Sequence, residues 1–337
     1  MTTDVFLIIG GLALVALTLA DVFETVLAPG GSEAFLKVVR RTVFLVLPVW
    51  KRATSNRRGI SGMFAPFVLL CSFVTWICFL ALGFAAVIYA LRSEFDPPLS
   101  GFLDAVYFAG SSIVTIGMSE TDATGAARFA VLAAGLCGLA VITMAITYLL
   151  LVLNSVAKRD TGILKLNTTA GEPPSALTLL ERMAELRLRT EIPRMMRNAR
   201  EWCLTVRQSH ATHPSLIYFQ STGAGVGWPA ALGALLDLAL FAELLIDAEE
   251  LYGPAVLLRQ DALKLAEQIA DLVGLKPVPD VCSAELMNEV AARISRCGYN
   301  LKGIIDYEAT AATRTQLQAC VTAMAQHLGK PTTTLLR

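Results

Sequence analysis

Long apolar runs dominate the first half of the chain. Three stretches, residues 5–27, 61–91 and 126–156, are almost wholly apolar. Each exceeds the roughly 20 residues that an α-helix needs to cross a bilayer. The last two are longer than required, which favours tilt or extension beyond the hydrocarbon layer. The pattern therefore predicts three membrane-spanning helices in the first 160 residues.

The charges between these runs predict an orientation. Residues 28–60 contain many lysines and arginines, and Glu33 is their only acid, whereas residues 92–125 are rich in acids. Basic residues follow the third run again at 158–165. Because loops rich in lysine and arginine stay on the cytoplasmic side, we expect a multi-pass protein of the cell membrane. Its N-terminus would lie outside and its C-terminal region in the cytoplasm.

A shorter apolar run at residues 43–50 complicates this topology. Pro48 interrupts it, and basic residues precede it. This arrangement favours an amphipathic helix over residues 33–50, lying on the inner membrane surface. The alternative is a fourth span, which would place the N-terminus inside. Asp21 and Glu24, near the end of the first span, are expected to pair with arginines of this basic segment or else to form a proton or ion relay.

Beyond residue 160 the apolar positions recur at helical spacing among many polar ones. Residues 167–174 are polar and end in two prolines, which indicates a linker over 160–175. The run at 228–246 is apolar, but it contains Asp237 and Glu243. Since carboxylates are costly inside a membrane, we expect a buried core helix there. The predicted regions are 1–60 (N-terminal helix and basic segment), 61–159 (membrane module), 160–175 (linker) and 176–337 (cytosolic all-helical domain).

Composition agrees with an all-α membrane protein, since charged residues make up 17% of the 337, below the ~25% of soluble domains. Acidic and basic residues number 28 each, which gives no argument for nucleic-acid binding. The seven cysteines form no CxxC pair and indicate neither a disulfide framework nor a zinc site. His210 and His213 lack a third ligand type nearby. We therefore expect no enzyme activity, cofactor or resident metal.

The external loop contains the most informative segment. Residues 102–114 are apolar enough to enter a membrane but too short to cross it, which predicts a re-entrant helix. The six residues Thr115 to Glu120 follow, and they lead directly into the third apolar run. Non-helical backbone at membrane depth is tolerated only inside protein or against water.

This order of outer helix, short helix, polar segment and inner helix over residues 61–156 resembles the pore module of potassium channels. The family's selectivity filter reads Thr-Val-Gly-Tyr-Gly, followed by Asp. Thr115, Ile116 and Gly117 fit this pattern. Met118 stands where an aromatic residue is usual, and Ser119 and Glu120 replace the second glycine and the Asp. The extra N-terminal helix and the helical C-terminal region resemble those of bacterial channel-like proteins.

The resemblance implies a homotetramer in which four filters surround potassium ions with backbone carbonyls. Filter backbones alternate in handedness, which glycine permits without steric cost. At Ser119 a left-handed backbone would cost roughly 1–2 kcal/mol, or a peptide flip would turn a carbonyl away. We therefore expect weakened potassium selectivity. Glu120 would form an anionic ring at the pore mouth, or else an exposed acid at a loop end.

The inner helix offers further candidates. Gly135 and Gly138 are either a gating hinge or a site of close helix packing. Thr143, Thr147 and Asn154 lie roughly in line at helical spacing and are candidate cavity-lining residues, although Asn154 could instead cap backbone groups. The leading hypothesis is a passive cation channel with lipid and an unknown cytosolic ligand as partners. The alternatives are a non-conducting receptor or scaffold, and a membrane enzyme.

Overall fold

A computed structural model describes residues 2–26, 38–54, 64–117, 121–219, 221, 227–333 and 335. The chain divides into two compact units, residues 1–153 and residues 154–337. We call them the N-terminal unit and the C-terminal unit and describe each by itself. The described part is almost entirely helical, as the sequence predicted.

Three of the helices are long and apolar enough to cross a membrane: α1 (Thr2–Val26), α4 (Phe64–Ala90) and α6 (Ala127–Ala170). They confirm the three predicted apolar helices to within a few residues at their N-terminal ends. At 1.5 Å per residue, α4 is about 40 Å long and α6 about 66 Å, against a hydrocarbon core of about 30 Å. Helix α6 therefore extends well beyond any membrane that it crosses.

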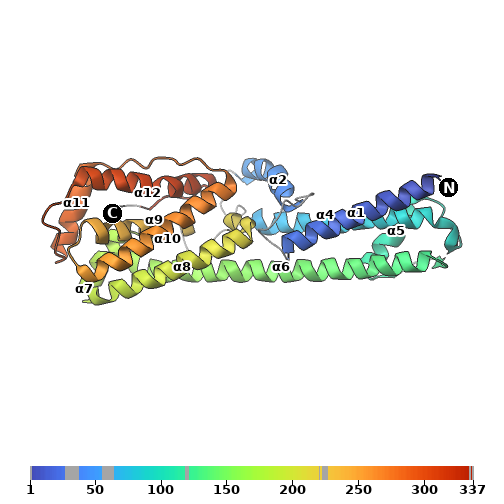
Figure 1. The fold of residues 1–337 in the computed structure, drawn as a ribbon, viewed down its shortest axis with the longest axis horizontal. Coiled ribbons are helices and arrows are strands. Elements are labelled where there is room, and N and C mark those ends of the chain that lie inside the picture. The colour runs from blue at the N-terminus through green and yellow to red at the C-terminus, as the bar shows by residue number, and fades with distance from the viewer. Residues whose placement is uncertain are drawn as a thin grey trace. The chain divides into compact units, whose positions relative to one another are not determined.

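Two glycines let α1 and α4 lie against each other (Figure 1). A Cβ atom added to Gly11 would be 2.5 Å from the carbonyl oxygen of Gly83, and one added to Gly83 would be 2.8 Å from the side chain of Val15. Small residues at such crossings allow backbones to approach closely, which is how helices associate in lipid. Gly11 and Gly83 therefore fix the α1–α4 pair.

Asp21 joins three helices of the N-terminal unit. Its side chain is buried, and its Oδ2 atom accepts hydrogen bonds from the indole Nε1 of Trp76 on α4 (2.7 Å) and from the backbone N–H of Val38 (3.3 Å). Val38 begins α2 (Val38–Thr54), where the helix dipole favours a negative group. Of the arginines expected as partners, Arg57, Arg58 and the side chain of Arg40 lie outside the described part of the chain. The described donors to Asp21 are an indole and a backbone amide.

Helix α2 corresponds to the predicted amphipathic segment, and Pro48 lies inside it. With 17 residues it is shorter than the roughly 20 needed to span a bilayer, and it is not among the three span-length apolar helices. Its Trp50 ring contacts the rings of Phe64 and Phe67, with centroids 5.9 and 5.3 Å away. These contacts attach α2 to the start of α4.

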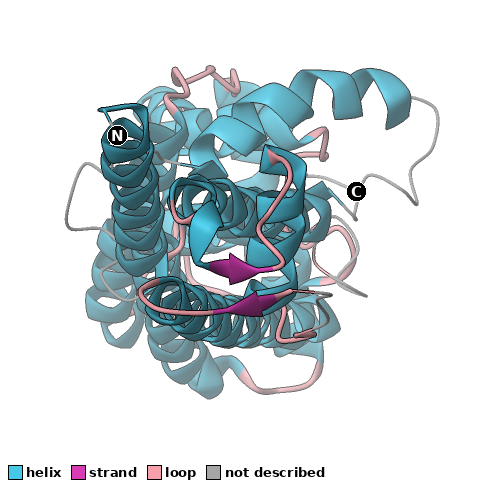
Figure 2. Ribbon diagram, turned by 90° about the vertical axis from the view of Figure 1, so that its right-hand side faces the viewer, coloured by secondary structure: helices cyan, strands magenta, loops and turns pink. Residues whose placement is uncertain are grey.

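A small cap closes the other end of the N-terminal unit. After the 3-10 turn η1 (Arg92–Glu94), strand β1 (Phe95–Asp96) pairs antiparallel with β2 (Asp122–Ala123), as the magenta arrows in Figure 2 show. The Oε2 atom of Glu94 accepts a hydrogen bond from the backbone N–H of Ala127 (2.9 Å) and so caps the first turn of α6. The cap therefore ties the end of α4 to the start of α6.

The structure corrects the predicted linker at residues 160–175. Helix α6 continues through this region to Ala170, and the chain turns only at Gly171–Pro174, where the φ of Gly171 is +79°. Proline cannot continue a helix and disfavours helical geometry before it, so Pro173 and Pro174 end α6. Residues before them remain helical because Ile163 and Ala170 are buried in the C-terminal core. The boundary between the units accordingly falls after Leu153 rather than at residue 159.

The rest of the C-terminal unit is a helical bundle around α9 (Trp228–Leu244), which is buried along almost its whole length. Helices α10 and α12 pack against α9, and α8 lies beside α10 (Figure 1). The prediction of a buried core helix at this apolar run is confirmed. The remaining elements are α7 (Ala176–Glu185), η2 (Arg189–Glu191), α8 (Ile192–Thr212), η3 (Pro214–Tyr218), α10 (Glu249–Val273), α11 (Ala284–Arg296) and α12 (Tyr307–Leu328).

The carboxylate of Asp237 on α9 is neutralised inside this bundle. Arg314 on α12 donates to it from Nε (2.9 Å) and Nη2 (3.2 Å), and both side chains are almost completely buried. Gln318 adds a hydrogen bond of 2.8 Å, and Arg314 also reaches Asp280. Because a buried charge without a partner is very costly, this network explains how α9 carries an acid in the core.

We predict that Arg314→Met destabilises the chain strongly. Removing one partner of a buried ion pair leaves the other charge uncompensated and costs roughly 3–5 kcal/mol. The control is Arg194→Met, since Arg194 pairs with Glu191 but is 71% exposed, and surface pairs contribute only about 0–1 kcal/mol. Thermal unfolding of the full chain in detergent should give a much lower midpoint for the first variant. Equal midpoints would contradict the proposed importance of the network.

Candidate pore segment

The predicted re-entrant helix is α5 (Phe102–Ile113). Its first turn is held by Asp104, whose Oδ2 atom accepts hydrogen bonds from the N–H of Gly101 (3.0 Å) and the hydroxyl of Ser100 (2.5 Å). One face, including Ala105 and Ala109, is buried within the chain. The other face is apolar too, yet Leu103 and Tyr107 are 79% and 64% exposed. An apolar face of this kind requires lipid or another protein chain as its neighbour.

Helix α5 ends in a tightly bonded turn. The N–H of Ile116 donates to the carbonyl of Ser111 (2.9 Å), and the N–H of Thr115 donates to that of Ser112 (3.0 Å). Together these bonds form a Schellman motif, in which the residue after the helix cap has a left-handed backbone. Here that residue is Thr115, with a φ of +58°. The turn directs the chain away from the helix axis immediately after Val114.

Threonine is an unfavourable residue for this position, which glycine usually occupies. A β-branched residue with positive φ is an outlier, and the left-handed conformation costs roughly 1–2 kcal/mol. Strain of this kind persists only where the surrounding structure imposes it, and it is concentrated at functional sites. Thr115 is the first residue of the predicted filter, so the strain occurs where the resemblance placed a function.

The backbone alternates in handedness along the described part of the predicted filter. The φ angle is positive at Thr115 (+58°) and at Gly117 (+67°) but not at Ile116 between them. Residues 114–117 are all exposed, and Ile116 is 62% exposed despite its apolar side chain. Residues 115–117 therefore have a non-helical backbone of alternating handedness. Met118, Ser119 and Glu120 lie outside the described residues.

Gly138 of α6 lies directly against the end of α5. A Cβ atom added there would collide with the backbone of Ile113, whereas one added to Gly135 would be 3.5 Å from the carbonyl oxygen of Ser112, an ordinary contact. The packing alternative therefore accounts for Gly138, while nothing in the structure tests a hinge. The contact also supports the turn that follows Ile113.

The other candidate residues of the inner helix are exposed in the single chain. Thr143, Thr147 and Asn154 all have exposed side chains, and the hydroxyl of Thr147 donates to the carbonyl of Thr143 (2.9 Å). Exposed apolar side chains accompany them on α6, among them Leu136, Leu139, Ile146 and Leu150. The predicted cavity lining thus requires neighbouring chains to enclose it.

Residues 76–154 match a family model described as an ion channel. The match covers the second half of α4, all of α5 with the turn that follows it, and α6 as far as Asn154. No curated protein and no solved structure gave a significant match. The match and the three span-length apolar helices indicate a membrane protein that contains a segment similar to ion channels. The matched segment contains the short helix, the polar segment and parts of the outer and inner helices that carried the resemblance to potassium channels.

Sequence reasoning missed two residues of this region. Glu94 was counted only among external acids, although it caps α6; an acid shortly after an apolar run carries no signal for such a distant contact. Thr115 was expected to offer oxygen atoms, and its positive φ was not foreseen because glycine is the usual signal for that conformation.

We predict that Gly138→Ala destabilises the chain and that Gly135→Ala does not. The added methyl group at position 138 meets backbone, which cannot move cheaply, and overpacking typically costs 1–3 kcal/mol. At position 135 alanine fits and improves helix propensity by up to about 1 kcal/mol. Thermal unfolding in detergent compares the two. If both variants unfold at the same temperature, the close contact at Ile113 is not important for stability.

We predict that Thr115→Gly raises the stability of the chain by up to about 1 kcal/mol, because relief of the left-handed strain, roughly 1–2 kcal/mol, exceeds the added entropy of the unfolded chain, roughly 0.5–1 kcal/mol. The matched control is Val114→Gly, since Val114 has a negative φ of −85° and glycine there only adds unfolded-state entropy. The unfolding midpoint should rise for the first variant and fall for the second. A fall for both would show that Thr115 is not strained.

Proposed function

We propose that this chain forms a homotetrameric cation channel with potassium as its permeant ion. The single observation that supports it best is the turn at residues 114–117. It follows a short apolar helix, alternates in backbone handedness and falls inside the segment that matches the ion-channel family model. The ions would move passively down their electrochemical gradient.

The physical reason is the cost of removing water from an ion. A dehydrated cation needs a substitute shell, and backbone carbonyls directed at a common axis supply one. One chain contributes a single strand of such carbonyls and cannot surround an ion. Four copies around an axis complete the shell. They would also cover the exposed apolar faces of α5 and α6, including Leu103 and Leu136, which a single chain leaves open.

Selectivity depends on residues beyond Gly117. We infer from the sequence that Met118 and Ser119 loosen the outer ion sites, since they replace an aromatic residue and a glycine. Glu120 from four chains would then concentrate cations at the mouth. In the proposed topology the N-terminus and this mouth are outside the cell membrane, and the C-terminal unit is cytoplasmic.

A non-conducting receptor or scaffold is the second candidate function. The departures from the potassium-channel filter at Met118 and Ser119 favour it, because a filter that cannot complete its ion sites need not conduct. The same pore architecture would then serve only to hold the assembly together.

Flux measurements with Gly117→Ala test the conducting function. An added Cβ at this position meets open space within the chain, so only the positive φ of +67° opposes it. We expect at least a tenfold loss of potassium flux in liposomes with an unchanged oligomer size. Gly10→Ala is the control, since Gly10 of α1 also faces open space but has no positive φ, and it should keep full flux.

The two candidate functions give different outcomes in the same liposomes. Cation flux in the unmodified protein supports the channel, and its absence at every voltage and pH supports the scaffold. Reversal potentials under mixed sodium and potassium then measure selectivity. Weak discrimination is expected, and strong potassium selectivity would overturn the loosened outer filter while leaving the channel intact.

A further inference from the structure

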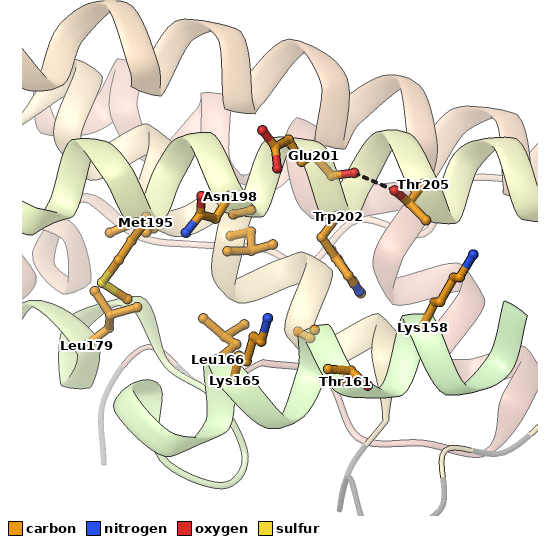
Figure 3. A pocket seen from close by; sticks show the side chains of 15 residues that line it. Lys158, Thr161, Lys165, Leu166, Leu179, Met195, Asn198, Glu201, Trp202 and Thr205 are labelled. Atoms are coloured by element: carbon orange, nitrogen blue, oxygen red, sulfur yellow. Dashed lines mark hydrogen bonds between the residues drawn. The ribbon is translucent and has the colours of Figure 1, made fainter. Parts of the chain in front are cut away.

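The C-terminal unit contains a pocket of about 730 Å³. It lies between the C-terminal part of α6 and helix α8 (Figure 3), and residues of α9 and Leu179 of α7 complete its lining. This volume falls in the range of small-molecule sites, which are about 300–1,000 Å³. No part of the proposed conduction mechanism uses the pocket.

The inner surface of the pocket is apolar. The buried residues Leu179, Leu235 and Leu238 line it together with the partly buried Met195 and Trp202. Met195 and Trp202 keep part of their apolar surface accessible to solvent, and covering that surface with an apolar ligand lowers the free energy. A ligand for this pocket therefore needs an apolar body.

The rim on α6 is cationic. Lys158 and Lys165 are seven residues apart and Thr161 lies between them, so all three fall on one face of the helix over two turns, about 10 Å. The sticks in Figure 3 show these side chains along the α6 side of the pocket. The described residues form no ion pair with either lysine; the lining contains one acid, Glu201, on α8. The rim thus has two positive charges available to a ligand.

Contacts of Trp202 and Arg159 hold the part of α6 that carries these lysines in place. The indole of Trp202 lies against Gly162, where any added Cβ would collide with it, and its Nε1 donates to the carbonyl of Arg159 (2.9 Å). The buried guanidinium of Arg159 donates in turn to the carbonyls of Leu216 (3.2 Å) and Phe219 (2.8 Å). These contacts lock α6 against its neighbours within the unit, so the pocket is preformed.

We propose that this pocket binds a small amphipathic organic anion. Its apolar body occupies the space bounded by Leu235, Leu238 and Trp202, and its carboxylate or similar group lies between Lys158 and Lys165. Asn198 and Thr205 on α8 offer additional hydrogen-bonding groups at the opposite rim. A neutral apolar molecule leaves the lysines unused, and a cation is repelled by them, so the combination selects an anion with an apolar body.

The test measures binding of naphthalene-2-carboxylate to the full chain in phosphatidylcholine nanodiscs by equilibrium dialysis. Naphthalene-2-carboxamide is the matched ligand of the same shape without the charge. We expect saturable binding of the carboxylate at one site per chain, and at least tenfold weaker binding of the amide. The proposal would be overturned if empty nanodiscs bound as much carboxylate as nanodiscs with the protein, or if the protein bound the carboxylate and the amide equally.

Two variants locate the site. The double substitution Lys158→Gln and Lys165→Gln should weaken carboxylate binding at least about tenfold, as expected for loss of charge-assisted hydrogen bonds. The double substitution Lys264→Gln and Lys276→Gln removes the same charge from exposed positions outside the pocket and should leave the affinity unchanged. Ala199→Phe fills the pocket from α8 and should abolish binding. Unchanged affinity in either pocket variant contradicts the site.

Discussion

The turn that follows Ile113 is the constraint on which the pore segment depends. A backbone that leaves a helix inside a membrane-spanning unit must keep its amides bonded, because unsatisfied polar groups are costly there. The Schellman bonds to Ser111 and Ser112 satisfy the amides of Thr115 and Ile116. Gly138 allows α6 to support the turn from behind. The strained Thr115 is the cost of this arrangement, and the bonds on both sides of it explain how it persists.

The two units bury carboxylates in different ways. Among the described residues, the donors to Asp21 on a span-length helix are neutral: an indole and a backbone amide at a helix N-terminus. Asp237, in the C-terminal bundle, has the full charge of Arg314 and the amide of Gln318. An arginine is expensive to place in lipid, whereas an indole is not, so the choice of partner follows the surroundings of each helix. In both units the carboxylate joins elements that are distant in sequence. Its hydrogen bonds therefore specify which elements contact each other.

Much of this architecture was predictable because membrane helices leave a strong signal in hydropathy. The beginnings of α1, α4 and α6, the short helix α5 and the buried α9 all follow from runs of apolar residues and the charges that interrupt them. The end of α6 was not predictable in the same way, since residues 160–170 contain polar side chains and only the burial of Ile163 and Ala170 keeps them in the helix. The conformation of Thr115 is also set by hydrogen bonds that a sequence does not display. The proposed filter and cavity are properties of an assembly, because one chain does not enclose an axis.

The glycines of α6 show how one helix serves both units. Each glycine in a helix interior costs roughly 1 kcal/mol relative to alanine, so its presence calls for a compensating contact. Gly138 admits the end of α5 in the N-terminal unit, and Gly162 admits the indole of Trp202 in the C-terminal unit. Between these two positions the helix is unbroken, and α6 contains no proline. Helix α6 therefore contributes Gly138 to the support of the turn before the proposed filter and Gly162 to one wall of the proposed anion pocket.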